Sequence, residues 1–269
     1  MSGEARTIGA STAPVTQAGL AADLRRLGVR PGSVLLVHTA MSKLGWVCGG
    51  AQAVVGGLLD ALGPHGTLVV PTHTNSNSEP SEWENPPVPD DWWPVIRATM
   101  PPYDPARTPA RALGVVVELV RTWPGARRSD HPHYSFAAVG PAAESVTAGH
   151  ELTSGLGEAS PLARVHDLGG DVLLLGAGHD SNTSLHLAEY RIPAPRRGES
   201  GAAVIRDGER AWVTWEDVVG DESDFDRIGA AFDATGAVSI GAVGAGEARL
   251  MRQRDLVAFG VDWMTANRT

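Results

Sequence analysis

The chain has 269 residues, a formal net charge of −9 and a composition typical of globular proteins, so it can bury a sizeable core in one domain. The acidic balance argues against a nucleic-acid partner, which would require a basic surface, and favours a cationic small molecule. No apolar run approaches the roughly 20 residues that span a bilayer, and the amino terminus lacks the apolar segment of a signal peptide. We therefore expect no membrane partner and a cytoplasmic location. The single cysteine, Cys48, excludes an internal disulfide.

The first part of the chain predicts a short tail followed by alternating helices and strands. Residues 1–14 are small, polar and without pattern, which indicates a flexible tail before one domain over residues 15–269. Thr16 is expected to cap a helix that ends at Gly28. This alternation is typical of a layered α/β domain. The elements expected next are a strand over 33–38, a helix over 52–62 and a strand over 67–71.

Residues 72–109 break this alternation, because they combine proline, asparagine, serine, glutamate and tryptophan with little periodicity. An irregular excursion of this length inside a compact domain predicts a functional loop or a lid. Regular structure is expected to return after it. The expected elements are a helix over 111–122, a strand over 134–140, a helix opened by Ser160 and Pro161, a hairpin over 203–215 turning on Asp207 and Gly208, a helix after an acidic stretch, and a terminal helix over 247–259.

The segment over residues 171–191 is the most informative about chemistry. An apolar run over 171–175 predicts a buried strand, Gly176 and Gly178 predict a tight turn, and Thr183 or Ser184 is expected to cap a helix. His186 falls in the first turn of that helix, where the positive end of the helix dipole disfavours imidazolium. A neutral ring that can accept a proton near pH 7 is therefore expected.

Glu189 follows His186 by three residues, which places its carboxylate on roughly the same helical face. There it can orient the ring or hold the charge that forms when the ring takes up a proton. An ordinary half-buried histidine, beside an acid favoured by the helix dipole, is the alternative that spacing alone leaves open.

Two further segments could bind an anionic ligand. Residues 38–50 form a strand end followed by a glycine-containing loop, with Lys43 available for a phosphate, although a plain turn fits equally well. Residues 127–135 contain two arginines and two serines, which also suit phosphate recognition. His131 and His133 could pair on a metal, but no third ligand has matching local spacing, so no metal is expected.

Acidic and aromatic residues predict where a cationic or sugar-like substrate would bind, through charge pairing and apolar faces. They come from the irregular segment after residue 71 and from the acidic stretch over 216–226, and for each carboxylate a solvated surface position is the alternative. The residues expected to bind substrate are Thr72, His73, Asn75, Glu79, Trp83, Glu216, Asp221 and Asp224.

Long strings in a fixed order carry a resemblance over about residues 15–259. They are VLLVHTAMSKLG, DALGPHGTLVVPT, NPPVPDDWWPVIRATMPPYDPARTPARALGVVVE, RRSDHPHYSFAAVG, SPLARVHDLGGDVLLLGAGHDSNTSLHLAEYR and DESDFDRIGAAF. With these the chain resembles the aminoglycoside 3-N-acetyltransferases, also called antibiotic N-acetyltransferases. The resemblance implies a single-domain layered α/β/α sandwich that differs from the GNAT acetyltransferases.

The resemblance also implies an activity: transfer of acetyl from acetyl-CoA to the 3-amino group of the 2-deoxystreptamine ring of aminoglycosides, which gives antibiotic resistance. His186, in the string HLAE, would be the catalytic base, assisted by Glu189, and no metal would be needed. One departure is that Thr39 and Ala40 stand where many relatives have two serines. The implied cofactor contacts are His38, Thr39, Met41, Ser42, Lys43, Leu44, Gly45, Trp46, Val47, Arg128, Ser129, Ser135 and Phe136.

Two rival functions are left open by the sequence. The chain could acetylate another small biosynthetic amine, because the sequence does not fix the acceptor. It could also sequester cationic drugs without turnover. For an acetyltransferase we expect direct transfer in a ternary complex, with no covalent acetyl-enzyme. Either a monomer or a homodimer is compatible with the sequence.

Overall fold

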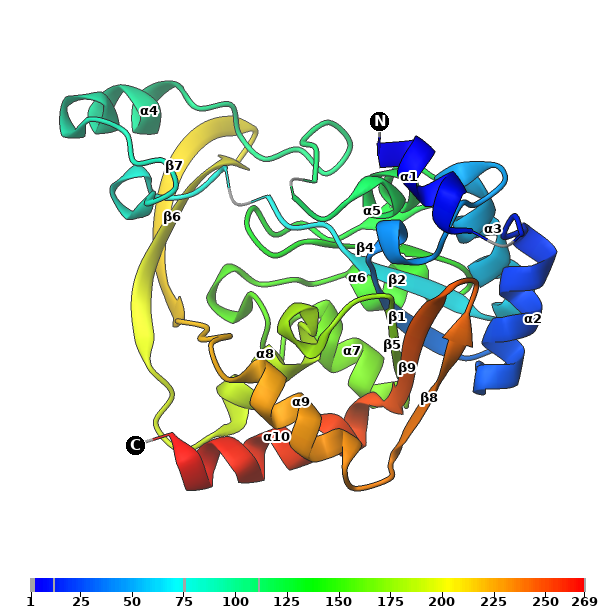
Figure 1. Ribbon diagram of the computed structural model, residues 1–269. Coiled ribbons are helices and arrows are strands. Elements are labelled where there is room, and N and C mark those ends of the chain that lie inside the picture. Colours follow the sequence, from blue (N-terminus) through cyan, green and yellow to red (C-terminus); the bar gives the residue numbers. More distant parts are fainter. Residues whose placement is uncertain (1–2, 12, 75, 111, 269) are drawn as a thin grey trace.

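The computed structural model describes residues 3–11, 13–74, 76–110 and 112–268. Its centre is a seven-stranded mixed sheet with strand order β3-β4-β2-β1-β5-β9-β8 (Figure 1). These strands are β1 (Val34–Thr39), β2 (Thr67–Pro71), β3 (Arg127–Arg128), β4 (Phe136–Val139), β5 (Asp171–Leu175), β8 (Val238–Val243) and β9 (Gly246–Arg252). Strand β1 pairs in parallel with both β2 and β5, and the remaining pairs are antiparallel. The carboxyl ends of β1, β2 and β5 therefore meet at one edge of the sheet.

Helices cover both faces of this sheet. Alternation along β1 sends Leu35 and Val37 into one core cluster and Leu36 into the other, as the two-residue period of a strand requires. The helices on the first face are α2 (Gln17–Leu27), α3 (Gly50–Leu62) and α5 (Val115–Arg121). Those on the second face are α6 (Ala143–Thr147), α7 (Pro161–Asp167), α8 (Ser184–Arg191), α9 (Phe225–Asp233) and α10 (Gln253–Asn267). The predicted layered α/β/α arrangement is confirmed.

A hairpin stands apart from the main sheet, as Figure 1 shows. Its strands, β6 (Arg197–Arg206) and β7 (Glu209–Val218), form a separate two-stranded sheet and turn on Asp207 and Gly208, both with positive φ, as predicted. The side chain of Asn77 ties β6 to the main body, because its amide exchanges hydrogen bonds of 3.0 and 3.1 Å with the backbone of Ala203. Near the hairpin tip, Arg210 donates to the carbonyls of Met100 and Arg97.

The chain termini differ from the sequence expectation. Within the expected tail over 1–14, residues Gly3–Ala10 form helix α1, and Glu4 accepts a hydrogen bond of 3.2 Å from the indole of Trp46. The helix expected over 247–259 was wrong in its first half, because that half is strand β9, and its partner β8 was not predicted. Leu250 and Met251 of β9 are buried on opposite faces of the sheet. Read with Leu256 and Val257 of α10, their positions in the sequence resemble the apolar spacing of one continuous helix, which explains the wrong prediction.

The irregular segment after β2 contains one helix that the sequence did not reveal. Helix α4 (Trp93–Thr99) begins with a proline in its first turn and lies beyond the tip of the hairpin (Figure 1). It carries no buried side chain, so it lacks the apolar face from which helices are predicted. The short 3-10 helices of the structure are η1 (Met41–Lys43), η2 (Pro80–Glu82), η3 (Asp90–Trp92), η4 (Leu152–Ser154) and η5 (His179–Ser181).

Candidate active site

A histidine and a glutamate form a close pair on α8. The Nδ1 of His186 lies 2.6 Å from Oε2 of Glu189, and the side chains are 12% and 3% exposed. Because the carboxylate accepts the hydrogen of Nδ1, the neutral ring keeps its lone pair on Nε2. The expected i,i+3 contact between His186 and Glu189 is thus present.

The expected side-chain cap of α8 is absent from the described residues at its start. Thr183 makes no cap hydrogen bond, and Oδ1 of Asn182 accepts from the backbone N–H of Ser184 instead.

The second oxygen of Glu189 is bound by groups that are distant in sequence. Its Oε1 accepts from the backbone N–H of Asp221 at 2.9 Å and from the guanidinium of Arg268 at 2.5 Å. Both carboxylate oxygens therefore have partners, as a buried carboxylate requires. The orientation of His186 is set through Glu189 by the loop after β7 and by the residue that follows α10.

The loop after β7 also packs directly on the His186 ring. A Cβ on Gly220 would lie 2.9 Å from both Cε1 and Nδ1 of this ring, so only glycine fits there. The ring of Phe225 meets the imidazole edge to face with centroids 4.8 Å apart. Oε2 of Glu222 lies 3.8 Å from Nε2 of His186, and this carboxylate is 74% exposed. The free nitrogen of His186 thus faces an acid near solvent, which suits a cationic amine.

Two more histidines come from the strand ends at the same edge of the sheet. His38 is the penultimate residue of β1, and its Nε2 lies 3.3 Å from the Thr183 hydroxyl. Burial, and then the nearby His186, lower the pKa of His38 to about 3, and the same two causes lead in lowering the pKa of His73 to about 3. Both rings are neutral at physiological pH. The buried Nε2 of His73 has no hydrogen-bond partner among the described residues.

The loop after β1 contains the first group of expected cofactor contacts. It forms η1, and the Ala40 N–H donates to Leu175 at the end of β5 over 2.9 Å. Lys43 is exposed and makes no ion pair within the described part of the chain. It lines a cavity of about 410 Å³ together with Gly176, Gly178 and Arg249. A free ammonium beside glycine backbone fits a phosphate-bearing ligand.

Not every side chain of this loop is available to a ligand. Leu44 and Val47 are buried in the first core cluster, so only their backbone could touch a cofactor. Ser42 is exposed, whereas Thr39, Met41, Gly45 and Trp46 are half-buried. Contacts from these residues to a cofactor stay predictions.

The second group of expected cofactor contacts has internal partners. Arg128 donates to the hydroxyls of Thr72 and Ser135 and to the carbonyls of Thr72, Pro105 and Thr108. The Ser129 hydroxyl accepts from the N–H of Phe136 at 2.9 Å, and the Phe136 side chain is fully buried. The arginine and serines that suggested a phosphate site therefore join the ends of β2, β3 and β4, and their role toward a cofactor stays a prediction.

The expected substrate residues come from the end of β2, the segment around η2, strand β7 and the loop after β7. Thr72 is buried beside Ser135, at 3.1 Å between hydroxyls, and Asn75 lies outside the described residues. Glu79 is paired with Arg97, whose hydrogen bond, with those of Ser81, lowers the pKa of Glu79 even though burial alone would raise it. The remaining positions are Trp83, whose indole donates to Ser78 at 2.9 Å, Glu216, exposed on β7, and Asp221 and Asp224, both beside Arg268.

Sequence reasoning missed several acidic residues near this region. Asp217, not Glu216, points inward from β7: its carboxylate accepts from the Tyr190 hydroxyl at 2.7 Å and from the Gly155 N–H at 2.8 Å. Burial raises the pKa of Asp217. Burial also raises the pKa of Glu82, with smaller effects from Glu79 and Glu199. The two-residue alternation of the hairpin strand was the signal that could have identified Asp217.

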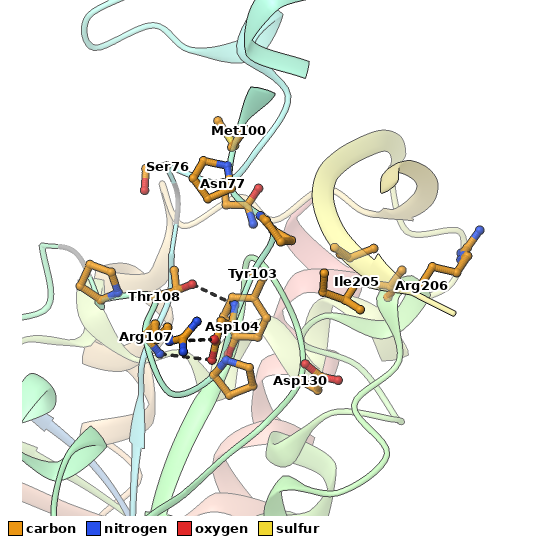
Figure 2. Close-up of a pocket in the computed structure, with 16 residues that line it drawn as sticks. Ser76, Asn77, Met100, Tyr103, Asp104, Arg107, Thr108, Asp130, Ile205 and Arg206 are labelled. Atoms are coloured by element: carbon orange, nitrogen blue, oxygen red, sulfur yellow. Dashed lines mark hydrogen bonds and ion pairs between the residues drawn. The ribbon is translucent and has the colours of Figure 1, made fainter. Parts of the chain in front are cut away.

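A larger cavity of about 1120 Å³ lies at the hairpin tip and is shown in Figure 2. Its lining includes Tyr103, Asp104 and Arg107 on one side and Ile205 and Arg206 of β6 on another. Asp104 pairs with Arg107 at 3.6 Å, so much of the charge in this cavity is internally balanced. None of the expected catalytic or substrate residues lines it.

Two further features concern the whole described chain. Across residues 3–11, 13–74, 76–110 and 112–268, no group of three or more histidine, cysteine, aspartate or glutamate side chains is arranged to hold a metal ion. His131 and His133, which the sequence raised as metal ligands, bond instead to backbone groups. None of the described helices is long and apolar enough to cross a membrane.

Comparison with known proteins gives consistent matches over almost the full length. A protein of Bacillus subtilis named "SPbeta prophage-derived aminoglycoside N(3')-acetyltransferase-like protein YokD" is 41% identical, and 97% of each chain is covered. "Aminoglycoside N(3)-acetyltransferase VII" of Streptomyces paromomycinus is 39% identical, with 94% of this chain and 93% of the relative covered.

Solved structures agree in fold. The crystal structure of YokD superposes with a TM-score of 0.96 at 40% identity, over 98% of each chain. AAC-IIIb bound to CoASH has a TM-score of 0.85 at 35% identity, over 94% of this chain and 97% of that one. AAC-VIa bound to sisomicin has a TM-score of 0.85 at 32% identity, over 96% of this chain and 100% of that one.

The matching family profile carries the description "Aminoglycoside 3-N-acetyltransferase" and spans residues 36–265. This range includes the paired His186 and Glu189, the loop after β1 and the hairpin. Together with the relatives and the shared fold, it assigns the chain: it is a member of the aminoglycoside 3-N-acetyltransferase family.

Proposed function

We propose that this acetyltransferase transfers acetyl from acetyl-CoA to the 3-amino group of the 2-deoxystreptamine ring of an aminoglycoside, and so confers resistance. The observation that carries the proposal is the hydrogen bond of 2.6 Å between His186 Nδ1 and Glu189, which leaves Nε2 free beside Glu222. A relative bound to sisomicin and another bound to CoASH support both substrates.

His186 supplies the general base. An ammonium cannot attack a carbonyl carbon, so the acceptor must react as the neutral amine. The ammonium of the acceptor first loses one proton to solvent. As the new C–N bond forms, Nε2 of His186 takes a second proton from the nitrogen, and Glu189 stabilises the resulting imidazolium. When the C–S bond breaks, the imidazolium returns this proton to the departing sulfur, so the ring is neutral again after each turnover.

The loop after β1 is the part of the chain that would hold acetyl-CoA. Lys43 and the glycine backbone at the end of β5 would bind phosphate, and the backbone N–H groups of the loop would face the thioester oxygen. The thioester brings the activated acetyl group. Glu222, Glu82 and Asp221 would attract the ammonium groups of the acceptor.

The test is release of free thiol from acetyl-CoA on addition of a panel of 2-deoxystreptamine aminoglycosides. We expect release by the native chain and a fall of about 100-fold or more in His186→Ala, the usual scale for loss of a general base. His65→Ala removes an exposed histidine in the turn before β2 and serves as the matched control, with unchanged activity expected. Mass spectrometry and NMR of the product then locate the acetyl group.

A second candidate acceptor is an amine that is not an aminoglycoside. It is kept because the YokD relative is named only as "aminoglycoside N(3')-acetyltransferase-like". Saturable binding of acetyl-CoA without thiol release on any aminoglycoside would move the acceptor to another amine. Binding of aminoglycosides without any binding of acetyl-CoA would instead indicate sequestration. An acetyl group trapped on a side chain such as Cys48 would contradict direct transfer.

A further inference from the structure

We propose that Arg268 is a positioning residue for proton transfer at His186 and that it acts through Glu189. The inference rests on the proposed function, because it assumes that His186 is the base. Arg268 directly follows α10, and every nitrogen of its guanidinium is engaged. NH1 donates to Glu189 Oε1 at 2.5 Å, Nε and NH2 donate to the Asp224 carboxylate at 2.9 and 2.6 Å, and NH2 also donates to the Asp221 carbonyl at 2.6 Å.

Glu189 needs a permanent cation at this place. Its side chain is 3% exposed, and a buried carboxylate without a counter-charge is strongly destabilised. Its other partners are the neutral N–H of Asp221 and the His186 ring, which is a cation only when protonated. The hydrogen bonds that Arg268 donates to Asp224 and then to Glu189 raise its pKa, so it remains charged at every accessible pH.

The consequence for His186 follows from the sign of these charges. While Arg268 neutralises Glu189, the imidazole ring is not forced to supply the positive charge itself, and it stays free to take the proton of the acceptor amine. Without Arg268 the protonated ring would be the sole cation bound to a buried carboxylate. The imidazolium would then persist to higher pH, so a smaller fraction of the rings could act as a base.

Other charged groups around His186 do not replace Arg268. His38 and His73 are neutral, because their pKa values lie at about 3, and Tyr134 is neutral, because burial raises its pKa to about 12. The charged groups that face this region are Glu189 on α8, Glu222, Asp221 and Asp224 after β7, and Arg268 after α10. Arg268 is the arginine that bonds to Glu189, whereas Arg196 interacts electrostatically with Asp221.

Three variants of Arg268 separate charge from geometry. Arg268→Ala removes both, Arg268→Gln keeps a hydrogen-bond donor without charge, and Arg268→Lys keeps the charge without the planar fork. Arg252→Ala is the matched control. Arg252 stands at the other end of α10 and pairs with Asp171, which is 4% exposed and also pairs with Arg30, so this variant removes one of two cations from a buried carboxylate.

The readouts are the pH profile of kcat/KM and the NMR titration midpoint of the His186 ring between about pH 5 and 9, the range in which histidines titrate. In Arg268→Ala and Arg268→Gln we expect the acid limb and the midpoint to move up by about one pH unit. In Arg268→Lys both should stay near their native positions while kcat falls several-fold, because a lysine cannot bind the Asp224 carboxylate through two nitrogens and hold Glu189 at the same time. Arg252→Ala should leave both readouts unchanged.

Two results would overturn the inference: an acid limb and midpoint that stay in place in Arg268→Gln, or a shift of the same size in Arg252→Ala. The ring titration needs no turnover. If His186→Ala kept full activity, the proposed function would fail, yet the midpoint would still report whether Arg268 controls the protonation of His186. Should the alanine variant fail to fold, the glutamine and lysine variants carry the same test.

Discussion

Two groups of histidines in this molecule have different partners. His186 is bonded to the carboxylate of Glu189 and keeps one ring nitrogen free. In the histidine cluster formed by His131, His133 and His150, the rings bond to backbone groups and to a serine, and the rings of His131 and His150 lie 4.6 Å apart.

Burial lowers the pKa of both His133 and His150 to about 4, so the histidine cluster is neutral at physiological pH. Burial without a carboxylate partner thus keeps the rings of the histidine cluster neutral. The carboxylate of Glu189 gives His186 a partner that can stabilise an imidazolium.

The largest expected effect comes from removing the carboxylate that distinguishes His186. Glu189→Gln keeps the size of the side chain but cannot stabilise an imidazolium, so we expect kcat to fall by about 100-fold or more. Thiol release under saturating substrates measures this. Glu118→Gln is the control. Glu118 is a helix glutamate that, like Glu189, pairs with an arginine, but it lies in α5 and its partner is Arg121. If kcat fell equally in Glu189→Gln and Glu118→Gln, the carboxylate partner of His186 would have no special effect on activity.

The histidine cluster should reveal itself in the pH dependence of stability. The folded-state pKa of His150, about 4, is below the unfolded value of 6.5, so the unfolded chain takes up this proton first as pH falls. Stability from this residue is complete above pH 6.5 and is lost down to about pH 4, in total about 3 kcal/mol.

Urea unfolding between pH 6.5 and 5 tests this. His150→Gln should reduce the slope of the free energy of unfolding by up to about 1.4 kcal/mol per pH unit. His65→Gln, at an exposed site, is the control. A native slope that survives intact in His150→Gln would contradict a neutral buried ring at this position.

The smallest expected effects come from two glycines, one at each group of histidines. A Cβ on Gly220 would press on the His186 ring at 2.9 Å, whereas a Cβ on Gly155 would lie 2.5 Å from Tyr134 and 3.2 Å from His131. Gly220→Ala should therefore lower kcat/KM about tenfold through misplacement of the ring. Gly155→Ala should reduce stability by about 2 kcal/mol with kcat preserved. Steady-state kinetics and urea unfolding of both variants test this. A loss of stability in Gly220→Ala with normal kcat/KM, or a loss of kcat in Gly155→Ala with normal stability, would contradict the prediction.

The sequence predicted the central part of the site because its signals are local. The apolar run of β5, the turn at Gly176 with φ of 70° and the spacing of His186 and Glu189 are all encoded within one short segment. The partners of Glu189 are not, because Asp221 and Arg268 lie 32 and 79 residues further along the chain. Tertiary packing brings Asp221 and Arg268 to Glu189, and the spacing of residues in the sequence does not predict this contact.

The residues around Arg128 show what composition alone leaves undetermined. A run of arginines, serines and histidines has the composition of a ligand site, yet composition does not tell whether a side chain points outward. Strands β3 and β4 turn these groups toward Thr72, where hydroxyls and carbonyls use the donors of Arg128. Likewise, Asp217 and Glu216 are neighbours in sequence, and the pleat of β7 alone decides which of them is buried.

The separation of the hairpin from the seven-stranded sheet has an evolutionary consequence. Strands β6 and β7 form a separate two-stranded sheet, and anchors such as the amide of Asn77 and the carboxylate of Asp217 attach them to the rest of the molecule. Substitutions on the hairpin surface between these anchors need not displace the main sheet or helix α8, which carries His186. The hairpin can therefore accumulate substitutions more readily than the seven-stranded sheet.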